Sequence, residues 1–164
     1  MDATLFLVEI GRQLRTVNLD AVLIGNAAAA LQGAPVTTVD FDFMFRKTSR
    51  NMQKLKALAR ALDATVLRPY YPAADLFRVV RDDGLQIDFM ATIHGIRSFE
   101  GLRARSDVVE IGGTSIRVAA LADIIKSKQA ARRPRDLAVL PVLKGALEER
   151  SQKNKKSGGA QARE

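Results

Sequence analysis

Two aspartates, Asp40 and Asp42, lie two residues apart in a stretch that alternates between apolar and polar side chains. This alternation over residues 39–45 predicts a β-strand with both carboxylates on one face. The opposite face would carry Val39, Phe41, Phe43 and Phe45. The two aspartates would be roughly 6–7 Å apart along the backbone, so both side chains can reach one cation. Because aspartate is uncommon in strands, the pair indicates a metal site, with the polar outer face of an ordinary strand as the alternative.

A third aspartate, Asp88, lies on another predicted strand. Residues 76–81 and 85–90 flank the sequence Asp-Asp-Gly at 82–84, which is typical of a β-hairpin. Asp88 has apolar neighbours on both sides, as Asp42 does. Three carboxylates can hold two divalent cations about 3.5–4 Å apart, one activating an attacking oxygen and the other bridging phosphates. We therefore expect Asp88 to complete a site with the first two aspartates.

A predicted phosphate contact lies upstream, where Gly25-Asn26 separates an apolar strand at 21–24 from a predicted short helix at 27–32. The first turn of a helix offers unpaired amide donors and a positive dipole end, which suit a phosphate. Asn26 is also a good N-cap, and capping alone is the competing explanation for it. Gly33 is expected to end the helix.

The remaining pattern predicts helices at 4–17, 51–62, 121–131 and from 134 onward, and a second hairpin joining 108–111 to 115–118. In the last helix Leu137, Leu140, Leu143 and Leu147 are expected to face inward, and Pro141 to kink or divide it. Lys128 continues an apolar helical stripe. Tyr70-Tyr71-Pro72 can either stack a base or pack on the core. The fold class is α/β (α+β), with a mixed, twisted sheet, helices on one face, and two C-terminal helices closing a cleft.

The amino-acid composition limits the kinds of metal site that the chain can form. The 164 residues are enough for one domain with a real core. The absence of cysteine excludes disulfides and thiolate metal sites, which leaves oxygen ligands and the single His94, to which we assign no role. No apolar run reaches membrane-spanning length, and a cytoplasmic location is expected.

The net charge of +8 is unevenly distributed. Residues 150–164 hold five basic and one acidic side chain, which is half of the excess. Their Gly, Ser, Gln and Lys content predicts a basic, disordered tail after a domain at residues 1–149. The modest basic excess of the domain itself fits a polyanionic partner such as nucleotide or nucleic acid.

Four stretches, at residues 23–28, 33–42, 86–89 and 128–137, resemble the minimal nucleotidyltransferases of the DNA polymerase β superfamily. Within that superfamily the chain looks most similar to abortive-infection and toxin–antitoxin nucleotidyltransferases, over roughly residues 20–145. The resemblance implies nucleotide-binding roles for Gly25, Asn26, Thr38, Lys128 and Arg133. It implies metal binding and catalysis by Asp40, Asp42 and Asp88, with a structural role for Asp136 beside the basic pair. The implied cofactor is Mg²⁺ or Mn²⁺, and the implied substrate is a nucleoside triphosphate.

Two departures from the family pattern concern the phosphate site. The family usually has Gly-Gly or Gly-Ser where this chain has Gly25-Asn26, and often arginine where Val36 stands.

The expected reaction is transfer of a nucleoside monophosphate to an acceptor hydroxyl. The basic charge favours RNA, such as a tRNA end, over a protein hydroxyl or a small molecule such as an aminoglycoside. The alternatives are a non-catalytic nucleotide- or RNA-binding relative and an antitoxin-like partner protein; a cognate antitoxin is a further expected partner.

Overall fold

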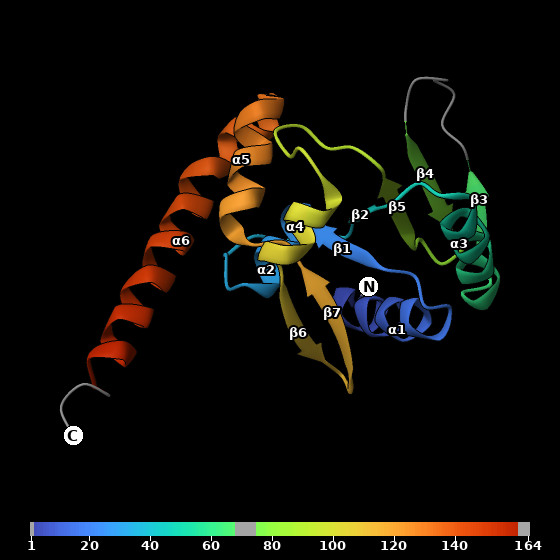
Figure 1. Ribbon diagram of the computed structural model, residues 1–164, viewed down its shortest axis with the longest axis horizontal. Helices are drawn as coiled ribbons and strands as arrows, with labels where there is room; N and C mark the ends of the chain where they lie inside the picture. Colours follow the sequence, from blue (N-terminus) through green and yellow to red (C-terminus); the bar gives the residue numbers. More distant parts are fainter. Residues whose placement is uncertain (1, 68–74, 161–164) are drawn as a thin grey trace.

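A computed structural model describes residues 2–67 and 75–160 (Figure 1). Within these residues the strands form one seven-stranded mixed sheet in the order β3-β4-β5-β2-β1-β7-β6. The strands are β1 (Ala21–Ile24), β2 (Phe41–Phe45), β3 (Thr65–Leu67), β4 (Leu76–Val80), β5 (Gln86–Met90), β6 (Asp107–Ile111) and β7 (Thr114–Val118). The helices are α1 (Ala3–Thr16), α2 (Gly25–Leu31), α3 (Ser49–Ala61), α4 (Phe99–Arg105), α5 (Leu121–Ala131) and α6 (Pro134–Ala160). The predicted mixed α/β fold and both predicted hairpins are confirmed.

The centre of the sheet sets which polar side chains meet. Strand β2 runs antiparallel to β1 and parallel to β5, and this register places Asp42 beside Asp88. Strand β4 runs antiparallel to β5 and places Arg78 beside Asp88. Side chains at register positions point to the same face of a sheet. Arg78, Asp88 and Asp42 therefore form one polar row across β4, β5 and β2.

The opposite face of these strands is the hydrophobic core. Phe43 and Phe89 are fully buried and stack with ring centroids 5.4 Å apart. The ring of Phe6, from α1, meets Phe41 edge-on. Because strand side chains alternate, burying these phenylalanines forces the aspartates between them onto the other face. The predicted strand is shorter than expected, however: β2 begins at Phe41, and Val39 is 57% exposed rather than in the core.

The two C-terminal helices pack against each other. Arg132 adopts a left-handed conformation (φ 55°) between them and lets the chain reverse into α6. Pro141 does not divide α6, which runs unbroken from Pro134 to Ala160. Leu140 and Leu143 are buried as predicted, but Leu137 is 47% exposed, which corrects the expectation that it faces inward.

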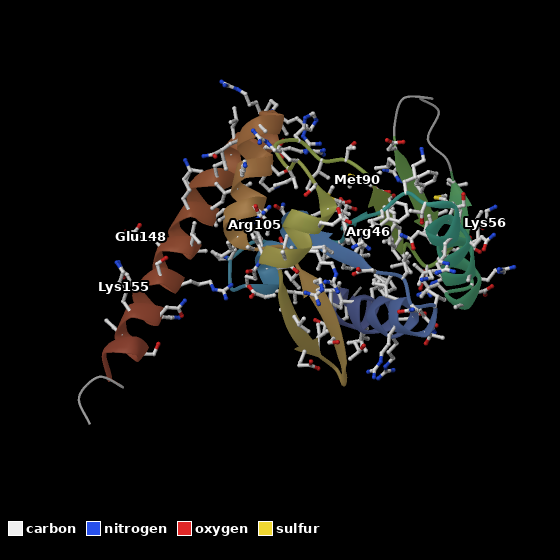
Figure 2. The ribbon with its side chains drawn as sticks, in the orientation of Figure 1. Arg46, Lys56, Met90, Arg105, Glu148 and Lys155 are labelled. Carbon is white, nitrogen blue, oxygen red and sulfur yellow. The ribbon has the colours of Figure 1, made fainter. Side chains whose placement is uncertain are left out.

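The tail predicted to be disordered is partly helical. Residues 150–160 continue α6, and Figure 1 shows this half of the helix projecting away from the sheet. Lys155, labelled in Figure 2, stands on this exposed part. The composition of this segment gives it no apolar face that could pack on the domain. We explain its helical structure as the extension of a helix whose first half is already anchored. Whether residue 149 marks a domain boundary stays a prediction.

Two sequence features lie outside the described residues: the Tyr70-Tyr71-Pro72 stretch and the last four residues of the chain. Among the residues that the structure does describe, no helix combines the length and apolar character needed to cross a membrane.

Replacing Phe89 with alanine should lower the free energy of unfolding by about 3–5 kcal/mol, because it leaves a cavity under the polar row. Val39→Ala, at an exposed position, should change it by less than about 0.5 kcal/mol. Urea denaturation of both variants measures the difference. A comparable loss in the two variants would mean that Val39 belongs to the core after all.

Candidate functional site

A cavity of about 1000 Å³ opens over the polar row. It is lined by every residue to which the sequence assigned a role: Gly25, Asn26, Thr38, Asp40, Asp42, Asp88, Lys128, Arg133 and Asp136. They come from α2, the loop before β2, β2 itself, β5, the two C-terminal helices and the turn between those helices. His94, to which the sequence assigned no role, also lines the cavity. Residues spread over more than a hundred positions therefore surround one space.

Gly25 is the first residue of α2 and touches the acidic strand. Its φ of +69° lies in the left-handed region, which favours glycine. A Cβ on this residue would lie 3.3 Å from Oδ2 of Asp42. Glycine therefore suits both the backbone turn and the space that the Asp42 carboxylate occupies.

Asn26 is not the N-cap that the sequence predicted. The N-cap position of α2 is Ile24, and Asn26 lies in the first turn. Its Oδ1 atom is buried without a hydrogen-bond partner among the described residues. An unpaired buried acceptor costs free energy, which is why such atoms are usually bonded. Asn26 thus lies on the cavity wall with an acceptor atom that no described residue satisfies.

The loop before β2 holds Asp40 by a short local turn. The Asp40 amide donates to Oγ1 of Thr38 over 3.1 Å. This side-chain-to-backbone bond is typical of threonine in turns. Thr38 thereby fixes the backbone of Asp40 at the point where it enters the strand, and Thr38 itself faces the cavity.

Asp42 is an acid of the site with a raised pKa. Burial, and then the negative charges of Asp88 and Asp40, raise its pKa to about 6, although Lys128 and Arg135 act in the opposite direction. Both main causes penalise the ionised form. At neutral pH an ionised Asp42 is therefore stabilised by any additional positive charge that enters the cavity.

Asp88 is already paired. Arg78 donates from Nε to Oδ1 over 2.8 Å and from Nη2 to Oδ2 over 3.0 Å, so one guanidinium engages both oxygens. Sequence reasoning missed Arg78. Counting outward from the turn at 82–84 would have found it, because pairing residue 81 with 85 places residue 78 opposite 88.

The opposite wall is basic and is organised by Asp136, which is 1% exposed. Arg133 Nε donates to Oδ2 of Asp136 over 2.6 Å, and Lys128 Nζ lies 3.5 Å from Oδ1. Burial opposes ionisation of Asp136, but the hydrogen bond and charge of Arg133, and then the charge of Lys128, outweigh it, so its pKa lies below the ordinary value. Burial lowers the pKa of Lys128 despite Asp136. Asp136 thus holds the positively charged side chains of Lys128 and Arg133 at the cavity.

A second missed residue is Arg135, which also lines the cavity and whose charge counters that of Asp42. It lies between Arg133 and Asp136, in the same basic block that carried the family resemblance. Its position in that block was the available signal.

The carboxylates fit a hard divalent cation only in part. Asp40 and Asp42 offer oxygen ligands and mutual repulsion that a cation relieves. Within residues 2–67 and 75–160, however, no group of three acidic or histidine side chains is gathered closely enough to hold a metal ion. Both oxygens of Asp88, the third carboxylate, accept hydrogen bonds from Arg78.

Solved structures with this fold include several nucleotidyltransferases. The antibiotic-resistance factor ANT(2″)-Ia matches with a TM-score of 0.62 at 13% identity, over 97% of this chain and 95% of that chain. The lincosamide antibiotic adenylyltransferase LnuA matches with a TM-score of 0.63 at 10% identity, over 89% and 98%. An antigenic nucleotidyltransferase-like protein from Paracoccidioides brasiliensis matches with a TM-score of 0.54 at 15% identity, over 96% and 91%. At these identities the likeness establishes the fold.

No curated protein sequence matches the chain significantly. A family model does match, over residues 4–157, which is nearly the whole chain. The resemblance to minimal nucleotidyltransferases is thereby confirmed. The chain belongs to the family described as nucleotidyl transferase of unknown function (DUF2204).

Proposed function

We propose that the protein transfers a nucleoside monophosphate from a nucleoside triphosphate to an acceptor hydroxyl. The acceptor oxygen forms a bond to the α-phosphorus, the bond from that phosphorus to the bridging oxygen breaks, and pyrophosphate leaves. The observation that carries this proposal is that one cavity has acidic and basic residues in its lining. The acidic row consists of Asp40, Asp42 and Asp88, and the basic wall consists of Lys128, Arg133 and Arg135. Family and fold support nucleoside monophosphate transfer in general.

On the acidic side, Asp40 and Asp42 would hold Mg²⁺ or Mn²⁺, which when bound neutralises phosphate charge. The raised pKa of Asp42 supports this role, because Lys128 and Arg135 only partly offset burial and the charges of Asp88 and Asp40, and a metal ion would supply further positive charge. Asp88, the third proposed metal ligand, would also orient the acceptor hydroxyl and accept its proton. Catalysis in such a site comes from positioning and charge neutralisation rather than from covalent chemistry.

On the basic side, Lys128 and Arg133 would contact the phosphates, held in place by Asp136. The Gly25-Asn26 turn would contact the triphosphate from the other direction, with the Asn26 side chain replacing the glycine or serine usual in the family. Because the Lys128–Asp136–Arg133 group is anchored within the protein, the phosphates meet cations that are already oriented.

For the acceptor we propose RNA, such as a tRNA end, in a toxin–antitoxin or phage-defence setting. Two features support an anionic acceptor. Arg133 and Arg135 are exposed at the cavity, and the projecting half of α6 carries further exposed basic side chains. These are Arg150, Lys153, Lys155 and Lys156. Basic surfaces of this kind bind nucleic acid backbones.

A small-molecule acceptor is the second candidate. Two proteins of the same fold are described with such molecules, ANT(2″)-Ia with adenylyl-2″-tobramycin and LnuA with lincomycin. A cationic aminoglycoside needs free carboxylates. Apart from Asp40 and Asp42, which are proposed to hold the metal ion, the carboxylates of this cavity are bonded to arginines: Asp88 to Arg78, Asp123 to Arg105 and Asp136 to Arg133. This pairing favours the anionic acceptor.

Incubation of the full chain with each α-³²P-labelled nucleoside triphosphate, Mg²⁺ and total cellular RNA should give labelled RNA. The double substitution Asp40→Ala and Asp42→Ala should reduce labelling by at least about a hundredfold, because it removes both proposed metal ligands. Exposed Asp82, in the hairpin turn outside the cavity, provides the matched control, and Asp82→Ala should label RNA like the unaltered protein.

Equal labelling by the double variant would overturn the catalytic proposal. Labelling of an aminoglycoside or of protein in place of RNA would retain the transferase and replace its acceptor. Nucleotide binding without any transfer would identify a non-catalytic relative.

The raised pKa of Asp42 predicts a pH-dependent stability. Its folded-state pKa of about 6 exceeds the unfolded value of 3.8, so the folded protein holds the proton more tightly and loses stability as pH rises from about 4 to about 6. Asp42→Asn should remove this loss. Relative to the unaltered protein, the variant should gain about 1–2 kcal/mol between pH 4.5 and pH 8.

Urea denaturation at both pH values measures this gain, with Asp82→Asn as the control for loss of one surface charge. Added Mg²⁺ at pH 8 should stabilise the unaltered protein and leave Asp42→Asn nearly unaffected. A stability difference between Asp42→Asn and the unaltered protein that is the same at both pH values would contradict the proposed charge repulsion.

A further inference from the structure

We propose that Arg78 is a latch on Asp88, which keeps this carboxylate from a divalent cation until phosphates enter the cavity and offer the guanidinium another partner. The proposal rests on the proposed function and adds a role for a residue outside the family motifs. Arg78 is thus a positioning residue whose effect is exerted through Asp88.

The geometry of the pair is that of a strong bond. Arg78 and Asp88 are register partners on antiparallel β4 and β5, so their side chains leave the same face of the sheet side by side. The guanidinium engages both carboxylate oxygens, over 2.8 and 3.0 Å. The Asp88 side chain is only 11% exposed, which limits competition from water. Two parallel charge-assisted bonds of this kind are stronger and more directional than single ones.

The pair and a metal ion compete for the same atoms. A cation can bind Asp88 only through the two oxygens that Arg78 now engages. When a binding-competent state is only a fraction of the population, the apparent affinity falls by that fraction. The closed pair should therefore weaken the binding of a second cation, although Asp40 and Asp42 can still bind a first.

Arg78 also serves the other two aspartates. The hydrogen bond to Asp88 raises the pKa of Arg78, and the negative charges of Asp88, Asp40 and Asp42 raise it further. In the resting protein Arg78 is thus a built-in counter-charge for the acidic row. Removing it without replacement by a metal ion would leave three carboxylates to repel one another.

The latch can open because only one partner is deeply buried. The Arg78 side chain is 41% exposed and lines the cavity, in contrast to Asp88. A triphosphate in the cavity would provide oxygens that suit the same planar fork of donors. Phosphate and the second cation would then favour one open state, so each would strengthen binding of the other by the same factor.

Titration of the full chain with Mn²⁺ alone, with free Mn²⁺ followed by electron paramagnetic resonance, tests the latch without relying on catalysis. The unaltered protein should bind one ion. Arg78→Gln should bind a second ion or bind Mn²⁺ at least about tenfold more tightly, because the competing charge has gone. The matched control is Arg117→Gln, on β7 and outside the cavity, which should bind like the unaltered protein.

Two further variants separate the latch from a general charge effect. Adding Asp88→Asn to Arg78→Gln should abolish the gain, since the released ligand is then missing. Arg78→Lys keeps the charge and the fold but cannot engage both oxygens at once, so it should give an intermediate affinity. Circular dichroism checks that each variant is folded.

Mn²⁺ binding by Arg78→Gln and Arg78→Lys that equals that of the unaltered protein would overturn the latch, and so would an equal gain in Arg117→Gln. Neither result would touch the proposed transferase, which is judged separately by RNA labelling with the unaltered chain. Failure of that labelling, with the Mn²⁺ gain intact, would instead refute the proposed function and leave the latch standing.

Discussion

The arrangement depends on one electrostatic constraint, which is the placement of several carboxylates on the inner wall of a single cavity. Parallel pairing of β2 with β5 puts Asp42 directly beside Asp88. Like charges this close are unfavourable in a partly buried place. The surrounding elements supply the compensation. Arg78 comes from β4 on one side. On the other side, Lys128 comes from α5, Arg133 from the turn that follows it and Arg135 from α6.

The hydrophobic core holds this charged row in place. In β2 and β5 the apolar residues Phe41, Phe43, Ile87 and Phe89 point into the core, and Asp42 and Asp88 between them point to the cavity. The packing of Phe43 on Phe89 therefore also fixes the register of Asp42 against Asp88. A slip by one residue would bury the acids and expose the rings. The same contacts that stabilise the domain therefore position the site, and the two properties cannot be varied independently at these strands.

Much of this was readable from the sequence, because period-two alternation and turn signals are local. The strands with Asp42 and Asp88, the two hairpins and five of the helices (α1, α2, α3, α5 and α6) follow from such patterns, whereas the short elements β3 and α4 were not predicted. The expectations that differed depend on tertiary context. Val39 continues the alternation but extends past the end of the sheet, and Asn26 looks like a cap although the helix starts earlier. The Arg78 bond required cross-strand register, which a single strand pattern does not reveal.

The contact between Gly25 and Asp42 has a consequence for how the molecule can change. An alanine at position 25 would strain the left-handed backbone and crowd the carboxylate 3.3 Å away. The turn at the start of α2 and the middle of β2 therefore share a single patch of free volume. A substitution at the Gly25 turn must fit the Asp42 side chain, and a substitution at Asp42 must fit the turn. This pair of positions therefore limits how the pocket can be adapted to new ligands.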